Sequence, residues 1–413
     1  MGTTHTIRKV GFWTVLSIVI GSSIGSGIFM IPSALAKYGS LSLLGWVLTG
    51  GGTMILAFAF MRLSHRLPFS GGPYIYAKHG FGDYIGFQVG WNYWIATCVS
   101  NAGLAVSFTA YTAYFFPILE SFPLYGFCSS AGIIWLLTFL NMKGISESGV
   151  FQIITTFLKL LPIIIIIGYG AFHVSTENFY PFQATASLSS FQIIMISATI
   201  TLWAFLGFEA GTVPADDVEN PQKIIPQATF WGTLVVIIIA LGSSSVIMGL
   251  IPNTQLQESV APFSEAAQKL FGPIGGQIVA LGAIVSILST LNGLTIIQGQ
   301  LPWATAKDGL FPKYFNKKNH NNAPVRSLFV SAFFITIMLG FKYQESLQEQ
   351  CQFLLLFSTL TTLIAYLFPI LTDLKEILKM PKKNALQIFF ALIGFAYIIF
   401  CMMGAGQEQV MYG

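Results

Sequence analysis

The stretch that decides the fold is GSSIGSGIF at residues 21–29, inside an apolar run that extends over residues 10–36. Glycine in the interior of a helix costs about 1 kcal/mol relative to alanine, and three glycines lie between residues 21 and 27. Backbone that is not helical survives at the depth of a lipid bilayer only where protein or an aqueous cavity satisfies its polar groups. The stretch therefore predicts a broken membrane helix that lines a cavity.

The composition of the whole chain agrees with a membrane location. Charged residues make up 9% of the 413 residues and hydrophobic residues 54%, whereas roughly 25% of the residues in ordinary globular proteins are charged. A membrane-spanning helix needs roughly 20 apolar residues. These numbers exclude a water-soluble enzyme, a nucleic-acid-binding protein and a disordered scaffold, and they predict a polytopic membrane protein surrounded by lipid.

Apolar segments that could span a bilayer recur along the entire chain. We predict eleven, at residues 10–36, 41–61, 84–116, 124–140, 150–172, 191–213, 225–251, 274–297, 328–341, 353–371 and 386–403. The fold class that follows is an all-α membrane protein with one transmembrane domain, residues 1–413.

The distribution of basic residues predicts the orientation. With the N-terminus in the cytoplasm, 16 of the 20 Lys and Arg residues fall in cytoplasmic segments, while Lys37, Lys269 and Lys342 are outside and Lys159 lies within a span. Cytoplasmic loops are enriched in Lys and Arg. We therefore predict a plasma (inner) membrane protein of a bacterium with a cytoplasmic N-terminus. The odd number of spans places the C-terminus outside, and the net charge of +4 needs no nucleic-acid partner.

The sixth predicted span contains a second interruption, WAFLGFEAG at residues 203–211, with the carboxylate of Glu209 inside it. Interruptions in spans one and six are five spans apart, which is typical of inverted five-helix repeats that meet at a binding site near the bilayer midplane. We predict repeats at residues 10–172 and 191–371 and an extra helix at 386–403.

Broken helices expose backbone groups that can bind a ligand. Free amides at a helix N-terminus suit a carboxylate, and freed carbonyls suit an ammonium group. Together they predict a site for an amino acid. The alternative is that the small residues of 21–27 only allow close helix packing.

Several motifs resemble those of the amino acid-polyamine-organocation (APC) superfamily of transporters. They are Gly25-Ser26-Gly27-Ile28-Phe29, residues 68–74 (PFSGGPY), residues 203–209, residues 219–221 (ENP), residues 261–263 (APF) and residues 308–312 (DGLFP). The resemblance runs from about residue 9 to the end of the chain, and the nearest branch is the basic amino acid/polyamine antiporters, particularly the arginine/agmatine exchangers.

The resemblance implies a leucine-transporter-like fold and a set of binding residues. It implies that the substrate carboxylate meets the amides around Ser26 and Gly27, and that the amino group meets carbonyls at Ser23, Trp203 and Leu206. Trp203 would then act as an aromatic lid. The remaining substrate-binding residues on this basis are Ser22, Tyr93, Ala96, Thr97, Asn101, Leu104, Thr290, Leu294 and Ser358.

The chain departs from the arginine/agmatine exchangers in two respects. Those exchangers have a second tryptophan on the eighth span, where this chain has Leu294. A guanidinium group stacks well on an aromatic ring, so arginine is not the expected substrate, and we expect a neutral or weakly polar amino acid. Family members usually have a twelfth span, and the segments predicted here stop at eleven.

Two charged residues lie inside predicted spans. A lysine at a helix centre costs roughly 2.5–3.5 kcal/mol on insertion, so Lys159 in the fifth span is a candidate for proton coupling, a role that lysines at this place have in several proton-coupled relatives. The alternative is a lysine that snorkels or pairs permanently with carbonyls. Glu209 is either a pH-responsive gate or a carboxyl that tethers the irregular backbone.

The sequence as a whole predicts a secondary transporter that works by alternating access, with proton-coupled uptake of an amino acid as the main hypothesis. Exchange of an amino acid for an amine is the alternative, and a transport-dead or truncated sensor or channel is an alternative of another class. All five histidines lie at span edges or in loops, so we predict no catalytic residue and no enzyme. We also predict no metal or other cofactor; a homodimer is left open.

Overall fold

The computed structural model describes residues 9–113, 115–185, 187–259, 261–341, 347–381 and 384–412. Within these ranges the chain is almost entirely helical, apart from an isolated parallel backbone bridge between Val10 and Val218. The predicted all-α class is confirmed. The helices are α1 (Phe12–Ser23), α2 (Ser26–Ala36), α3 (Leu43–Arg66), α4 (Pro73–Phe81), α5 (Asp83–Ala113), α6 (Ile118–Ser121), α7 (Pro123–Asn141), α8 (Ile145–Gly170), α9 (Ser190–Leu202), α10 (Pro221–Leu250), α11 (Asn253–Glu258), α12 (Pro262–Lys307), α13 (Val325–Phe341), α14 (Leu347–Leu378) and α15 (Ala385–Tyr412).

Nine of the eleven predicted spans each fall largely on a single helix, and some of these helices are longer than the prediction. The span at 10–36 contains both α1 and α2, and the span at 191–213 contains α9 followed by 3₁₀ turns. The predicted segment 274–297 lies within α12, which kinks at Gly272 and continues to Lys307. Gly272 has a positive φ of 73°, a conformation that glycine adopts without a steric cost. Eight helical segments within the described ranges are both long and apolar enough to cross a membrane, so the protein is an integral membrane protein.

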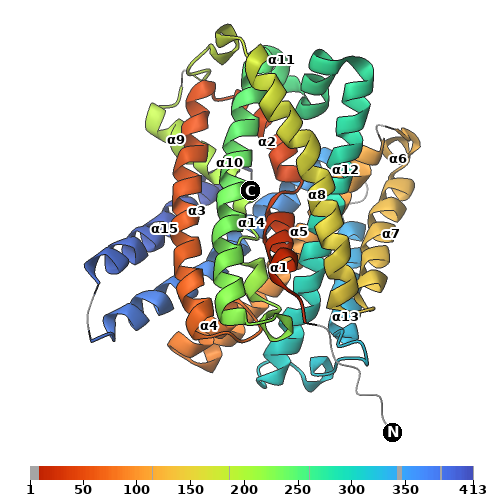
Figure 1. Ribbon diagram of the computed structural model, residues 1–413. Coiled ribbons are helices and arrows are strands. Elements are labelled where there is room, and N and C mark those ends of the chain that lie inside the picture. Colours follow the sequence, from red (N-terminus) through yellow and green to blue (C-terminus); the bar gives the residue numbers. More distant parts are fainter. Residues whose placement is uncertain are drawn as a thin grey trace.

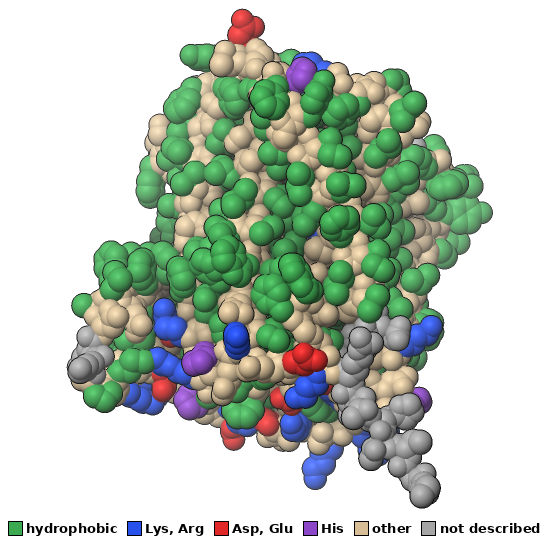
Figure 2. Space-filling view, viewed as in Figure 1, with side chains coloured by type: hydrophobic (Ala, Val, Ile, Leu, Met, Phe, Trp, Pro, Cys, Tyr) green, Lys and Arg blue, Asp and Glu red, His purple; other side chains and the backbone are tan. Residues whose placement is uncertain are grey.

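Helices α3, α8, α10 and α12 run alongside one another, with α1 and α2 near the centre of the molecule, whereas α15 lies obliquely to them at one side (Figure 1). Helix α1 packs against α8, α10 and α12, and α5 packs against α12 and α14. Hydrophobic side chains cover most of the height of the face in Figure 2, and charged side chains gather towards its lower end. That end contains α4 and the connection between α12 and α13 (Figure 1). We call it the charged end.

Both predicted helix breaks are present. Helix α1 ends at Ser23, Ile24 is extended, and α2 begins at Ser26. Helix α9 ends at Leu202, and single turns of 3₁₀-helix follow at Trp203–Phe205 and Ala210–Thr212 instead of regular α-helix.

The two breaks touch each other. Gly207 has a φ of 109°, and a Cβ atom there would lie 2.8 Å from the carbonyl carbon of Ser22. Only glycine fits both this backbone conformation and this distance. The contact brings the irregular backbone of both helices to one place inside the bundle.

Candidate functional site

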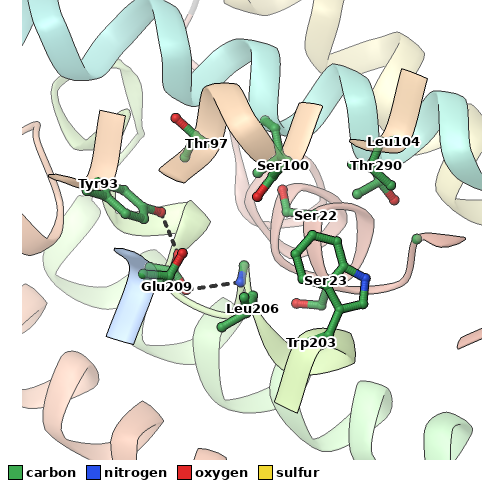
Figure 3. Close-up of a pocket in the computed structure, with 14 residues that line it drawn as sticks. Ser22, Ser23, Tyr93, Thr97, Ser100, Leu104, Trp203, Leu206, Glu209 and Thr290 are labelled. Carbon is green, nitrogen blue, oxygen red and sulfur yellow. Dashed lines mark hydrogen bonds between the residues drawn. The ribbon is translucent and has the colours of Figure 1, made fainter. Parts of the chain in front are cut away.

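A cavity lies where the two breaks meet α5, α12 and α14. Figure 3 shows that the side chains of Glu209, Ser100 and Trp203 surround it. The residues that line the cavity are Ser22, Ser23, Gly25, Tyr93, Thr97, Ser100, Leu104, Trp203, Leu206, Gly207, Glu209, Thr290, Leu294 and Thr362.

Most of the residues expected to bind substrate are brought together here. The cavity is lined by Ser22, Ser23, Tyr93, Thr97, Leu104, Trp203, Leu206, Thr290 and Leu294, and also by Glu209. Gly27 lies beside the lid residue, because a Cβ atom at Gly27 would lie 2.4 Å from Cδ1 of Trp203. Ser26 begins α2, and its side chain is outside the described residues.

Three expected binding residues are buried behind the cavity wall. The amide nitrogen of Asn101 donates to Oγ1 of Thr295 and to Oε1 of Gln298, both at 3.2 Å, so the side chain faces α12. Ser358 bonds to the hydroxyl of Ser100 and to the carbonyl of Ala96. Neither Asn101, Ser358 nor Ala96 lines the cavity.

Four lining residues were not among the expected ones: Gly25, Ser100, Gly207 and Thr362. Gly25 and Gly207 belong to the interrupted stretches, so their place at the cavity follows from the breaks. Ser100 had a signal too, because it shares one helical face with Tyr93 and Thr97.

Glu209 is the one acidic residue among the described residues that line the cavity. Its side chain is 2% exposed; Oε1 accepts a hydrogen bond from the hydroxyl of Tyr93, and Oε2 accepts one from the amide of Gly207 at 3.2 Å (Figure 3). Among the described residues that line the cavity, none is basic. A ligand that carries a positive charge is therefore the best electrostatic match for this site.

The rest of the lining is aliphatic or carries hydroxyl groups. Leu104, Leu206 and Leu294 offer apolar surface, and the half-buried ring of Trp203 lies against the first turn of α2. Such a surface suits a chain of methylene groups.

Lys159 donates hydrogen bonds to backbone carbonyls that the first break leaves without a helical partner. Its ammonium group is fully buried and donates to the carbonyls of Gly21, at 3.0 Å, and of Ile24. Thr290 also donates to the carbonyl of Ile24, at 2.8 Å. Lys159 does not line the cavity but holds the end of α1 next to it. The end of α1 is thus fixed by donors from α8 and α12.

Comparisons with known proteins agree with this architecture. A family model described as amino acid permease matches residues 10–410. A Haemophilus influenzae protein named putrescine transporter PotE is 31% identical over 416 residues, which covers 98% of this chain and 94% of that one. The Escherichia coli cadaverine/lysine antiporter is 28% identical over 98% of this chain and 91% of its own length.

Proposed function

The chain belongs to the amino acid permease family of the APC superfamily, and from this premise we propose that it exchanges an aliphatic amine for an amino acid. The observation that carries the proposal is the cavity at the two breaks, with one buried carboxylate and no basic residue among its described lining. Two relatives that match nearly the full chain are named for putrescine transport and for cadaverine/lysine antiport.

The cavity favours a cationic substrate over the neutral amino acid expected from the sequence. An ammonium group needs a counter-charge when it leaves water, and Glu209 can supply one. The leucine side chains at positions 104 and 294 contact a methylene chain better than a planar guanidinium group, which prefers an aromatic surface. Both points favour a linear amine or its parent amino acid over arginine.

The proposal assigns a role to each break. In an amino acid substrate, the carboxylate binds the amides at the start of α2, around Ser26 and Gly27, and Trp203 covers the substrate. Of the residues expected from the sequence, the proposed binding residues are Ser22, Ser23, Ser26, Gly27, Tyr93, Thr97, Leu104, Trp203, Leu206, Thr290 and Leu294, with Ser100 added from the cavity wall and Glu209 as the site of an ammonium group. Ala96, Asn101 and Ser358 support that wall from behind.

The proposed frame for these roles is the inverted repeat, with units at residues 10–172 and 191–371 and an extra helix at 386–403. The proposed orientation places the charged end and the N-terminus in the cytoplasm of a bacterial cell, because cytoplasmic loops are enriched in Lys and Arg.

Proton-coupled uptake is the second candidate, and Lys159 is the observation that favours it. The lysine is buried among carbonyls, and release and return of its proton would change how firmly the end of α1 is held. In this scheme an amino acid and a proton move together, and no internal amine is needed.

Purified protein in liposomes distinguishes the two candidates. Labelled lysine, ornithine, putrescine, cadaverine and neutral amino acids are offered outside, with and without internal amine and with and without a pH gradient. Exchange predicts uptake that requires internal substrate and saturates with the external one. Uptake that needs only the gradient would refute exchange and support symport.

A further inference from the structure

Asp217 lies at the charged end, directly after the second break, in a single 3₁₀ turn at Ala215–Asp217. It is 4% exposed although it carries a carboxylate. Its Oδ2 atom accepts a hydrogen bond from Nε2 of Gln300 at 2.9 Å and from the ammonium of Lys318 at 3.3 Å, and its Oδ1 atom accepts one from the amide of Asn322. Every one of these partners is distant in sequence.

The partners belong to two groups of elements. Gln300 lies on α12, and Lys318 and Asn322 lie in the connection from α12 to α13. On the opposite side, the carbonyl of Asp217 accepts a hydrogen bond from the amide of Val10 at 2.9 Å, immediately before α1. Asp217 therefore ties the ends of both broken helices to the α12–α13 side of the bundle.

Because Asp217 is buried, the junction that it forms with Gln300, Lys318, Asn322 and Val10 is stable only when its charged groups are paired. Desolvation raises the pKa of the Asp217 carboxyl, and the neighbouring Lys318 opposes that rise. Desolvation also lowers the pKa of the Lys318 ammonium, and Asp217 opposes that change. The ammonium of Lys318 also lies 3.7 Å from the centre of the Trp303 ring. Removal of one charge would leave the other buried without its partner, which is costly.

The neighbouring Asp216 provides a contrast within the same turn. Its Oδ2 atom pairs with Lys307 at 3.1 Å, and both side chains are substantially exposed, 30% for Asp216 and 55% for Lys307. Exposed ion pairs contribute little to stability because water and salt screen them. Two adjacent aspartates thus differ in burial, and only Asp217 joins the two groups of elements through a buried carboxylate.

A second cavity lies immediately behind the junction. It is small and is lined by Gln300 and by residues of α7, α8 and the 323–328 segment, including Asn141, Ser148 and Ala323. The Oε1 atom of Gln300 has no hydrogen-bond partner there.

We propose that Asp217 is a positioning residue of the transport cycle, whose carboxylate holds the ends of the broken helices against α12 and closes the charged end. Substrate reaches the cytoplasm only when Asp217 releases Gln300, Lys318 and Asn322 together. This role rests on the proposed transport function, because alternating access moves one group of helices against the other. It adds a gate that is separate from the substrate cavity.

The test measures opening of the charged end through a cysteine at Ala323, which is 1% exposed. The native residues Cys98, Cys128, Cys351 and Cys401 are first replaced by serine or alanine. The Ala323→Cys protein is placed in lipid nanodiscs, and the rate of its reaction with a membrane-impermeant maleimide is recorded. Asp217→Asn is expected to raise this rate at least about tenfold, because it removes the charge from several buried hydrogen bonds.

Matched variants separate gating from general damage. Asp216→Asn is the control and should change the labelling rate by less than about twofold. Lys318→Met should raise the rate like Asp217→Asn, and Lys318→Arg should restore a slow rate. If Asp217→Asn does not fold, Asn322→Ala takes its place, with an expected rise of about threefold for the loss of one hydrogen bond.

The KM of transport is a second measurement, and it would not change in opposite directions on the two faces if Asp217 only stabilised the fold. Asp217→Asn should lower the KM measured from the charged end and raise the KM from the opposite face. If the folded Asp217→Asn and Asp216→Asn proteins are labelled at equal rates, the proposed gating role of Asp217 is wrong. Labelling needs no transported substrate, so a protein that exchanges no amine would refute the proposed function and still leave the gate tested.

Discussion

Glu209→Gln is the substitution that most directly tests the chemistry of the cavity. A glutamine keeps one side-chain oxygen, which can still accept from the Gly207 amide, 3.2 Å away in the native protein. It also fits the volume that the carboxylate occupies beside Tyr93. The substitution therefore removes the charge while it preserves most of the support that the side chain gives to the irregular backbone.

The expected magnitude follows from the lost charge. Hydrogen bonds to charged groups contribute about 1.5–3 kcal/mol and neutral ones about 0.5–1.5 kcal/mol. The difference of about 1–2 kcal/mol corresponds to a rise in KM of about five- to thirtyfold at 25 °C. The rise should appear for putrescine, cadaverine and lysine, which carry an additional ammonium group, and the KM of any neutral amino acid that is transported should change by less than about twofold.

The assay is counterflow of labelled substrate into proteoliposomes that contain internal amine. Glu219→Gln is the matched control, because Glu219 is exposed and lies outside the cavity. An unchanged KM for all amines in a folded Glu209→Gln protein would refute the counter-charge role. Glu209 would then act only as a tether of the second break.

Three further substitutions test the neighbouring parts of the site. Gly27→Ala places a Cβ atom 2.4 Å from the ring of Trp203 and should reduce exchange by at least about tenfold without loss of folding. The control is Gly132→Ala, which should have no effect because no atom lies within 4 Å of the added Cβ. Equal activity of the two variants would contradict the role of Trp203 as a lid. Leu294→Trp should lower the inhibition constants of arginine and agmatine by about two- to thirtyfold relative to that of lysine, because a guanidinium gains an aromatic surface. Unchanged inhibition constants would place residue 294 away from the substrate. Lys159→Met should abolish any response of uptake to an imposed pH gradient, and an unchanged response would exclude proton coupling through this lysine.

The breaks could be predicted from the sequence because their signal is local. Glycines in a helix interior and a carboxylate in an apolar span both conflict with a regular membrane helix, and each conflict lies within nine residues. The contact between the breaks could not be predicted in this way. It depends on Gly207 lying against Ser22, and two residues so far apart in the chain share no local pattern.

The partners of Lys159 and of Asp217 lay beyond sequence reasoning for the same reason. Burial of Lys159 in a span was evident, but its acceptors, the carbonyls of Gly21 and Ile24, are more than 130 residues away. Asp217 lies beyond the end of a predicted span, and no local pattern identifies Gln300 and Lys318 as the partners of its carboxylate.

The cavity face of α5 shows how much helix geometry alone can decide. Residues 93, 97, 100 and 104 follow a spacing of four, three and four and share one face of the helix, and all four line the cavity. At about 100° per residue, Ala96 and Asn101 each point about 70° away from the centre of that face. The resemblance to a family included both, whereas helical periodicity favours Ser100 in their place. The structure agrees with the periodicity, because Asn101 turns towards α12. Where a resemblance and helix geometry disagree about a wall residue, the geometry of this chain is the better guide.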